Sequence, residues 1–284
     1  MRLILLTLIA IRLFALGGTM HLVRRSKDRP SHSVKRTAAI FCAVLALQAP
    51  ANMARADEPL RIASEGFYPP FNFFDAGGNL VGFDIDIARL LCEVMNVQCE
   101  LTAQDWDALI PGLLAGDYDA VIASMSITEA RKKQVAFSNP YYSNALSFVG
   151  DAQTGVKLGK PSLQGKAVGV QASTISADYL AGHWADVVRI EAYETQQDAF
   201  RALERGEVDL ALGDLYAMYG WLETESGKAY QFIGDPIDID DKIGIAVRKE
   251  DEALRHKINE ALAVILADGR YTEINLKYFP FDIY

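Results

Sequence analysis

Residues 114–124 read LAGDYDAVIAS, a sequence that predicts a helix ending at Gly116, a short acidic turn and a buried strand. The pattern returns at residues 204–214, which read ERGEVDLALGD. Ser124 and Asp214 fall at the same position of the two copies, where each strand ends. Two similar units whose strand ends face each other predict two lobes around a cleft.

Strand and helix patterns alternate on both sides of the two copies. The predicted strands lie at residues 60–64, 99–102, 120–123, 167–170, 187–190 and 210–212. The predicted helices lie at residues 84–95 with Asp84 as N-cap, 107–115, 196–205, and directly after Thr128 and Thr174. This alternation predicts an α/β fold in which each lobe is a mainly parallel sheet flanked by helices.

A final strand at 244–247 and a helix at 251–268 have no place in the repeat of the second lobe. The chain is therefore expected to leave the first lobe near Asn144 and to return to it near Ile243. Two crossings predict a two-stranded hinge. The predicted lobes comprise residues 57–144 with 244–284, and residues 145–243.

The first 56 residues have the layout of a secretory signal peptide with an upstream extension. Lys35 and Arg36 are basic, residues 37–47 are apolar, and Ala54-Arg55-Ala56 is a small-x-small cleavage site. The apolar run is shorter than the ~20 residues of a membrane-spanning helix. Residues 1–34 are either an unusually long n-region or precede the true start codon. We expect cleavage after Ala56 and a mature protein in the periplasm.

The predicted mature chain is strongly acidic. The first 56 residues hold nine of the 28 basic residues and one of the 37 acidic residues, so residues 57–284 carry a net charge of −17. Such a surface repels nucleic acid and anionic membranes. It argues against nucleic-acid binding and is compatible with a cationic ligand.

Two cysteines, Cys92 and Cys99, remain in the predicted mature chain. An even pair in an exported protein favours a disulfide over a metal site, and two free buried thiols are the alternative. The disulfide would join the end of a helix to the next strand. We expect neither a metal site nor a cofactor.

The strand ends select the candidate site, because ligands of open parallel sheets bind beyond the carboxyl ends of the strands. Side chains at or near these ends form the candidate set. In the first lobe they are Glu65, Tyr68, Trp106, Ser124, Met125, Ser126 and Arg131, and in the second Gln171, Ser173, Thr174 and Asp214.

Arg131 and Asp214 suit the two charged ends of an amino acid. The planar guanidinium clasps a carboxylate with two hydrogen bonds, and the aspartate accepts from an ammonium. Further donors for the carboxylate are the hydroxyls of Ser124, Ser126, Ser173 and Thr174, together with free amides at helix starts. The alternatives are a solvated arginine and an aspartate that only caps the helix at 215–222.

Glu65 follows an apolar strand and precedes a turn of one glycine, two aromatic residues and two prolines. Beside Tyr68 and Trp106, it suits a cationic side chain through charge pairing and cation–π contact. The alternative is an aromatic cluster that covers the sheet, with Glu65 bonded to local amides.

Several motifs resemble one known family. They are IASEGFYPPF at 62–71, GFDID at 82–86, WDALIP at 106–111 and SMSITEAR at 124–131. The chain resembles the periplasmic solute-binding proteins of polar amino-acid ABC importers, in the branch that binds lysine, arginine and ornithine, histidine or opines. The resemblance implies a two-lobed periplasmic binding protein of type II, without catalytic residues. It also implies a monomer that captures an L-amino acid, expected to be basic, by lobe closure and delivers it to an ABC permease.

The resemblance assigns roles to matching residues. The family's carboxylate-binding arginine falls on Arg131 and its ammonium-binding aspartate on Asp214. Its hydroxyl donors fall on Ser126, Ser173 and Thr174. The paired cysteines of its lysine/arginine/ornithine- and histidine-binding members fall on Cys92 and Cys99.

The chain departs from those members at the side-chain end of the site. It has Glu65 where they have Asp, Trp106 where they have Leu, and Ala123 where they have Ser. Opine-binding relatives share the Glu-Gly, Asp-Trp-Asp and Ser-Met-Ser features, so an opine such as octopine or nopaline is an alternative ligand. These relatives tend to have Asn at position 214, so Asp214 favours a free α-amino group.

Two other classes of function are compatible with this scaffold. A periplasmic cyclohexadienyl dehydratase would use Glu65 as a general acid. The intact pair of Arg131 and Asp214 and the lack of a catalytic histidine argue against it. A receptor sensor module is the third class, and the lack of a membrane span before Tyr284 restricts it to a fragment.

Overall fold

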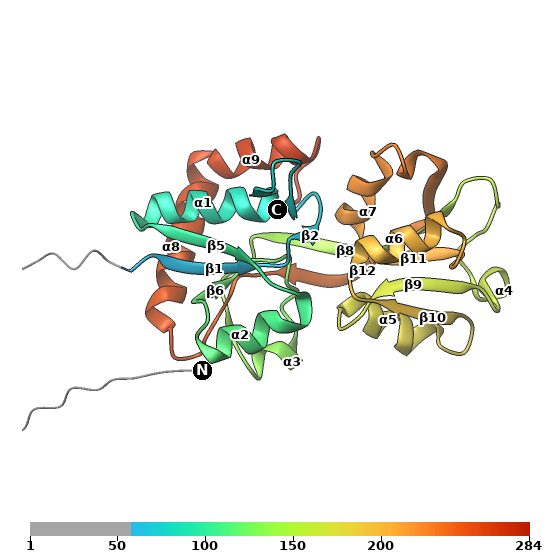
Figure 1. Ribbon diagram of the computed structural model, residues 1–284, viewed down its shortest axis with the longest axis horizontal. Coiled ribbons are helices and arrows are strands. Elements are labelled where there is room, and N and C mark those ends of the chain that lie inside the picture. The colour runs from blue at the N-terminus through green and yellow to red at the C-terminus, as the bar shows by residue number, and fades with distance from the viewer. Residues whose placement is uncertain (1–57) are drawn as a thin grey trace, which may run out of the picture. The chain divides into compact units, whose positions relative to one another are not determined.

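The computed structural model describes residues 58–284 (Figure 1). The predicted signal peptide and upstream extension, residues 1–56, lie outside the described residues. Two five-stranded sheets organise residues 58–284, and helices flank both. Within these residues, no helix combines the length and the apolar composition that crossing a membrane requires.

The first sheet has the strand order β5-β1-β6-β13-β7. β1 pairs in parallel with β5 and β6, whereas β13 runs antiparallel to β6 and β7. Its strands are β1 (Leu60–Ser64), β5 (Cys99–Ala103), β6 (Ala120–Val121), β7 (Ala136–Phe137) and β13 (Ala246–Val247). The helices of this lobe are α1 (Phe83–Met95), the 3-10 helix η1 (Trp106–Ala108), α2 (Leu109–Ala115), α3 (Glu129–Lys132), α8 (Glu252–Asp268) and α9 (Arg270–Tyr278). A small antiparallel sheet follows β1 in the chain and comprises β2 (Phe67–Tyr68), β3 (Asn72–Phe74) and β4 (Leu80–Val81).

The second sheet repeats this arrangement with the order β10-β9-β11-β8-β12. β9 pairs in parallel with β10 and β11, whereas β8 runs antiparallel to β11 and β12. Its strands are β8 (Tyr142–Asp151), β9 (Ala167–Gln171), β10 (Arg189–Tyr193), β11 (Leu210–Asp214) and β12 (Tyr230–Ile243). Its helices are α4 (Lys160–Leu163), α5 (Ile175–Trp184), α6 (Gln196–Glu204), α7 (Leu215–Leu222) and the 3-10 helix η2 (Gly227–Ala229).

The fold class is the predicted α/β class, and each sheet is mixed. The alternation in the sequence accounts for the three parallel strands on one side of each sheet. Two further strands complete each sheet in the antiparallel direction.

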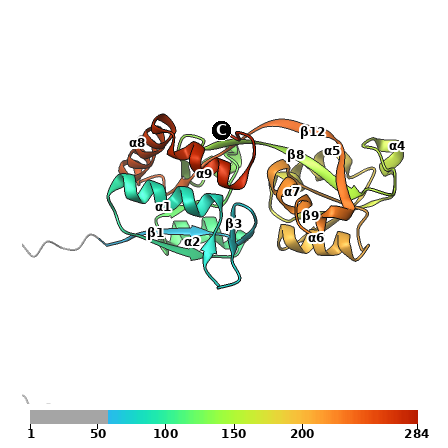
Figure 2. The same ribbon diagram turned by 90° about the horizontal axis from the view of Figure 1, so that it is seen from above.

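β8 and β12 run between the two lobes, side by side (Figure 2). Their antiparallel pairing extends from Tyr142 with Ile243 to Asp151 with Tyr230. The register shifts on both sides of Ile237, so the pairing is irregular between the two ends. The chain thus passes between the sheets on two adjacent strands.

Asp84 does not cap α1, contrary to the sequence prediction. The helix begins after Gly82, whose φ of 127° and close approach to the Phe71 carbonyl oxygen leave no room for a side chain. Asp84 lies in the first turn and is fully buried, where it accepts hydrogen bonds from other side chains.

Some predicted boundaries differ from those observed. The helix predicted at 107–115 is split into η1 and α2, and the strand predicted at 187–190 begins only at Arg189. Val187 and Val188 are buried in the core without being part of the strand, which explains the misplaced boundary. α9 is not among the predicted helices; it begins at Arg270, immediately after the left-handed Gly269 ends α8.

The predicted disulfide joins Cys92 to Cys99, with 6.1 Å between their Cα atoms. It connects the last turns of α1 to the first residue of β5. Asn96 ends the helix in the left-handed conformation, and its N–H donates to the carbonyl oxygens of Cys92 and Glu93. The crosslink and the helix cap together fix the return of the chain into the first sheet.

Candidate functional site

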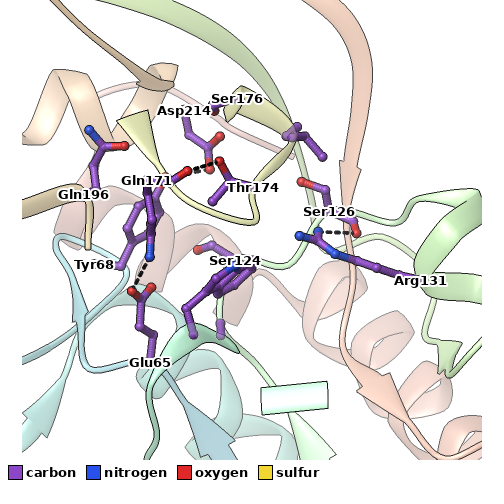
Figure 3. A pocket seen from close by; sticks show the side chains of 13 residues that line it. Glu65, Tyr68, Ser124, Ser126, Arg131, Gln171, Thr174, Ser176, Gln196 and Asp214 are labelled. Carbon is purple, nitrogen blue, oxygen red and sulfur yellow. Dashed lines mark hydrogen bonds between the residues drawn. The ribbon is translucent and has the colours of Figure 1, made fainter. Parts of the chain in front are cut away.

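A pocket lies between the two lobes at the carboxyl ends of their parallel strands (Figure 3). Nine of the eleven side chains predicted from the strand ends line it. These are Glu65, Tyr68, Trp106, Ser124, Ser126 and Arg131 from the first lobe, and Gln171, Thr174 and Asp214 from the second.

Met125 and Ser173, also predicted, do not line this pocket. The Met125 side chain is 1% exposed and packs in the core with Leu109 and Leu113. Ser173 has a left-handed backbone with a φ of 58°, and its carbonyl oxygen accepts hydrogen bonds from the first lobe. Both residues instead line an adjacent hollow beside Trp106.

Four lining residues were not predicted, namely Ala123, Ile175, Ser176 and Gln196. Ile175 and Ser176 begin α5, and Gln196 begins α6. Gln196 follows the end of β10, so the strand-end rule that selected Gln171 would have found it. Its side chain is buried, and its Nε2 has no hydrogen-bond partner among the described residues.

Arg131 lies at one end of the pocket. Its Nη1 donates to the Ser126 carbonyl oxygen at 2.9 Å and its Nη2 to the Ser173 carbonyl oxygen at 3.4 Å. The guanidinium carbon lies 5.1 Å from the centroid of the Trp106 ring, a cation–π contact. Burial lowers the pKa of Arg131, but an arginine keeps its charge at any physiological pH. The site therefore holds a fixed cation whose donors bond only neutral oxygens.

The start of α5 faces the same pocket. Thr174 caps this helix: its Oγ1 accepts from the Ala177 N–H at 3.2 Å and donates to the Gln171 carbonyl oxygen at 2.8 Å. The hydroxyl hydrogen of Thr174 is thus engaged within the second lobe. The backbone amides of Ile175 and Ser176, the first two residues of the helix, have no partner within it and suit an anion.

Asp214 ends β11 and is 8% exposed. Its Oδ2 accepts from the Tyr68 hydroxyl at 2.7 Å, across the pocket. The side chain makes no capping hydrogen bond to α7, which excludes the alternative that it serves only as an N-cap. Burial, and then repulsion from Asp241, raise the pKa of Asp214.

Glu65 occupies the opposite part of the pocket and is 2% exposed. Its Oε1 accepts from Gln171 Nε2 at 2.6 Å. The adjacent Gly66 N–H donates to Asn72 Oδ1 instead, so Glu65 does not bond this local amide. Burial raises the pKa of Glu65 to about 7. Among the described residues it has no cationic partner, so the pocket offers a buried acid with unused acceptor capacity.

Besides the bond from Arg131 to the Ser173 carbonyl oxygen, three hydrogen bonds connect the lobes around the pocket. Two are the Tyr68–Asp214 and Gln171–Glu65 bonds, and the third runs from Trp106 Nε1 to the Ser173 carbonyl oxygen at 3.1 Å. Since each has one partner on either lobe, the described conformation is a closed one.

Asp84 does not line the pocket but holds Ser124, which does. Its carboxylate accepts from Asn72 Nδ2 at 2.9 Å, Ser124 Oγ at 3.0 Å and the Tyr141 hydroxyl at 2.6 Å. Ser124 has a left-handed φ of 50°, so this bond fixes an unusual backbone at the strand end. Burial raises the pKa of Asp84 to about 6, and the three donors oppose this rise.

The donor set of the pocket does not suggest a metal. Among residues 58–284, no group of three or more histidine, cysteine, aspartate or glutamate side chains could hold a metal ion. The arrangement of a cation near helix-start amides and two separated buried carboxylates suits a zwitterion that carries an additional positive charge.

Comparison with known proteins agrees with this geometry. Residues 60–281 match the family model described as bacterial extracellular solute-binding proteins, family 3. An L-arginine-binding protein of Pseudomonas aeruginosa is 38% identical over 235 residues, which cover 81% of this chain and 91% of the relative. A histidine-binding periplasmic protein of Salmonella typhimurium is 38% identical over 259 residues, which cover 88% of this chain and 99% of the relative.

A solved structure of an ancestral arginine-binding protein bound to arginine has the same fold. It superposes with a TM-score of 0.73 at 35% identity and covers 78% of this chain and 98% of its own. Sequence, fold and site thus lead to one assignment: the chain belongs to the bacterial extracellular solute-binding proteins, family 3.

Proposed function

We propose that the protein is an extracytoplasmic solute-binding protein that captures a basic L-amino acid between its lobes and delivers it to an ABC permease. The observation that carries this proposal is the composition of one pocket. It contains a partly buried cation, Arg131, and two buried carboxylates on different lobes, Asp214 and Glu65. Relatives named for arginine and histidine binding support a basic ligand.

Each charged group has one role in this proposal. Arg131 binds the ligand α-carboxylate, assisted by Ser126 and by the amides at the start of α5. Asp214 binds the α-ammonium, and Tyr68 positions its carboxylate. Glu65 pairs with the cationic side chain, and Gln171 orients it. A guanidinium fits this end best, because it can donate to Glu65 with two parallel hydrogen bonds.

Lobe closure follows from the arrangement of the sheets. We assign residues 57–144 with 244–284 to one lobe and 145–243 to the other, with β8 and β12 as the hinge. Hinge bending about this pair would open the pocket and admit the ligand. Closure excludes water and strengthens the charge pairs. The names of the relatives support a periplasmic location, for which the proposed cleavage after Ala56 would be required.

Calorimetric titration tests the proposed ligand class. We expect heat with at least one of arginine, lysine, ornithine and histidine, and tighter binding than with glutamate, whose side chain repels Glu65. Octopine belongs in the same series. Its α-amino group is substituted, so its affinity relative to arginine distinguishes an opine-binding site from a site for free amino acids. If no cationic amino acid or opine binds, the basic-ligand proposal is wrong.

We further propose that the protein is not an enzyme. A buried glutamate with a raised pKa suits a general acid, so a cyclohexadienyl dehydratase is the competing activity. Among the described residues, no histidine lines this pocket. Arg131 and Asp214, the proposed partners of the two charged ends of an amino acid, both line it. After incubation with prephenate or arogenate, we expect the ultraviolet spectrum to match that of the substrate without protein. An aromatic product formed only with the protein would contradict this.

A further inference from the structure

Asp241 is a buried acid that the proposed binding roles do not use. It lies near the end of β12, opposite Asn144 of β8 in the register, and is 6% exposed. One of its oxygens, Oδ2, accepts two hydrogen bonds. They come from Ser126 Oγ at 3.3 Å and from Asn144 Nδ2 at 3.0 Å. Asp241 therefore contacts the first lobe and the other hinge strand at the same time.

Backbone hydrogen bonds near Asp241 connect residues 125–127, which precede Arg131, to the end of hinge strand β12. The Ile127 N–H donates to the Lys242 carbonyl oxygen at 2.8 Å, and the Gly244 N–H donates to the Met125 carbonyl oxygen at 3.1 Å. Between these bonds, Ser126 forms a β-bridge with Ile243. The Ser126 carbonyl oxygen in turn accepts from Arg131 Nη1, and Figure 3 shows the two residues next to each other.

Through its pairing with Asn144, Asp241 is also connected to Asp214, the carboxylate proposed to bind the ammonium. β8 continues from Asn144 to Leu146, which pairs with Asp214 in the register of β11. Repulsion from Asp241 raises the pKa of Asp214, whereas the guanidinium of Arg131 lowers the pKa of both carboxyl groups. Asp241 is thus linked through Ser126 to Arg131 and through β8 to Asp214, the two groups that are proposed to hold the ligand backbone.

Around Asp241, the acidic groups outnumber the cations that can neutralise them. The groups facing Asp241 are Asp214, Arg131, Lys242 and the hydroxyl of Tyr142. Lys242 is partly exposed and lies 3.3 Å from the exposed carboxylate of Asp240. Among residues 58–284, Arg131 is then the one cation, itself only partly buried, that faces both buried carboxylates, and a ligand carboxylate would engage it too.

We propose that Asp241 is a second acidic residue of the α-ammonium site. It does not line the pocket; it positions Ser126 and Asn144, and its charge adds to the preference for ligands with a free α-ammonium group. This inference rests on the proposed function, because it presumes that Asp214 receives the ammonium of an amino acid.

Two substitutions separate the charge of Asp241 from its hydrogen bonds. Because a single oxygen accepts both bonds, Asp241→Asn can keep them and remove only the charge. Asp240→Asn is the matched control. It removes the same charge from the neighbouring residue, whose side chain is exposed. Its φ of 52° is a conformation that asparagine tolerates well.

The first readout is selectivity. Calorimetry would compare arginine with 5-guanidinopentanoic acid, which lacks only the α-amino group. We expect Asp241→Asn to reduce the preference for arginine by about tenfold, the order of magnitude of a charge interaction across several ångströms of protein. We expect Asp240→Asn to leave the preference unchanged.

The second readout is the pH profile of arginine binding between pH 5 and 8.5. Burial raises the pKa of both Asp214 and Asp241, and the ammonium binds the ionised form, so affinity falls as pH decreases. Removing the charge at 241 relieves the repulsion on Asp214. The acid-side loss of affinity should therefore shift to lower pH in Asp241→Asn but not in Asp240→Asn.

The outcomes separate this inference from the proposed function. If the wild-type protein binds no amino acid, the proposed function fails. If it binds arginine but Asp241→Asn keeps the wild-type selectivity and pH profile, the inference about Asp241 is overturned. Equal loss of affinity for both ligands with an unchanged profile also overturns it, because it indicates a purely structural role.

Discussion

Arg131→Ala is expected to weaken arginine binding by roughly 30-fold or more, because truncating one partner of a buried charge pair costs about 2–5 kcal/mol. The ligand carboxylate would then face the start of α5 without a cation. The donors of Arg131 bond two carbonyl oxygens, which can turn to water or to other donors when the guanidinium is removed. Calorimetric titration with arginine measures the loss.

Arg131→Lys is the matched control for charge. Lysine retains the positive charge but lacks the planar fork and cannot stack on Trp106 in the same way. We therefore expect an affinity between those of the wild type and Arg131→Ala. Thermal unfolding of all three proteins checks that the fold is retained. Wild-type affinity in a folded Arg131→Ala protein would refute the carboxylate-binding role.

Asp214→Asn is expected to have a comparable effect at the other end of the ligand backbone. The ammonium would lose its charge partner, and the cost of leaving it buried is again about 2–5 kcal/mol. The asparagine oxygen can still accept from the Tyr68 hydroxyl, so the contact between the lobes should persist. Calorimetry with arginine at pH 8 measures the effect where the wild-type carboxylates are ionised.

Tyr68→Phe provides the graded comparison for this prediction. It leaves the Asp214 charge in place and removes one hydrogen bond, at 2.7 Å, that orients the carboxylate. A hydrogen bond to a charged group contributes about 1.5–3 kcal/mol, so we expect a smaller loss than for Asp214→Asn. The assignment of Asp214 would be wrong if Asp214→Asn bound arginine as tightly as Tyr68→Phe or the wild type.

The repeat in the sequence accounts for much of the pocket. Matching two helix-Gly-turn-strand units placed Ser124 and Asp214 at equivalent strand ends, and both line the pocket. Glu65 and Gln171 follow from the same rule, and a hydrogen bond joins them. Periodicity and the strand-end rule are local properties, so one sequence is sufficient to apply them.

The remaining residues depend on contacts between distant segments. Asp84 was expected to cap a helix, because aspartate before an apolar run is a common start signal. Its burial depends on Tyr141 and Ser124, which lie far along the chain. Asp241 stands in an acidic stretch that reads as a solvated loop, and only the pairing of β12 with β8 buries it. Local pattern cannot distinguish such residues from surface ones.

The place of β13 in the first sheet has a consequence for the order of folding. β13 contains residues 246–247 but lies between β6 and β7, whose residues precede it by more than 100 positions. The second sheet draws all of its strands from residues 142–243, a continuous part of the chain. During synthesis, which proceeds from the N-terminus, the second lobe can therefore assemble while the first still lacks an internal strand and the two helices α8 and α9. The lobe that begins first is completed last.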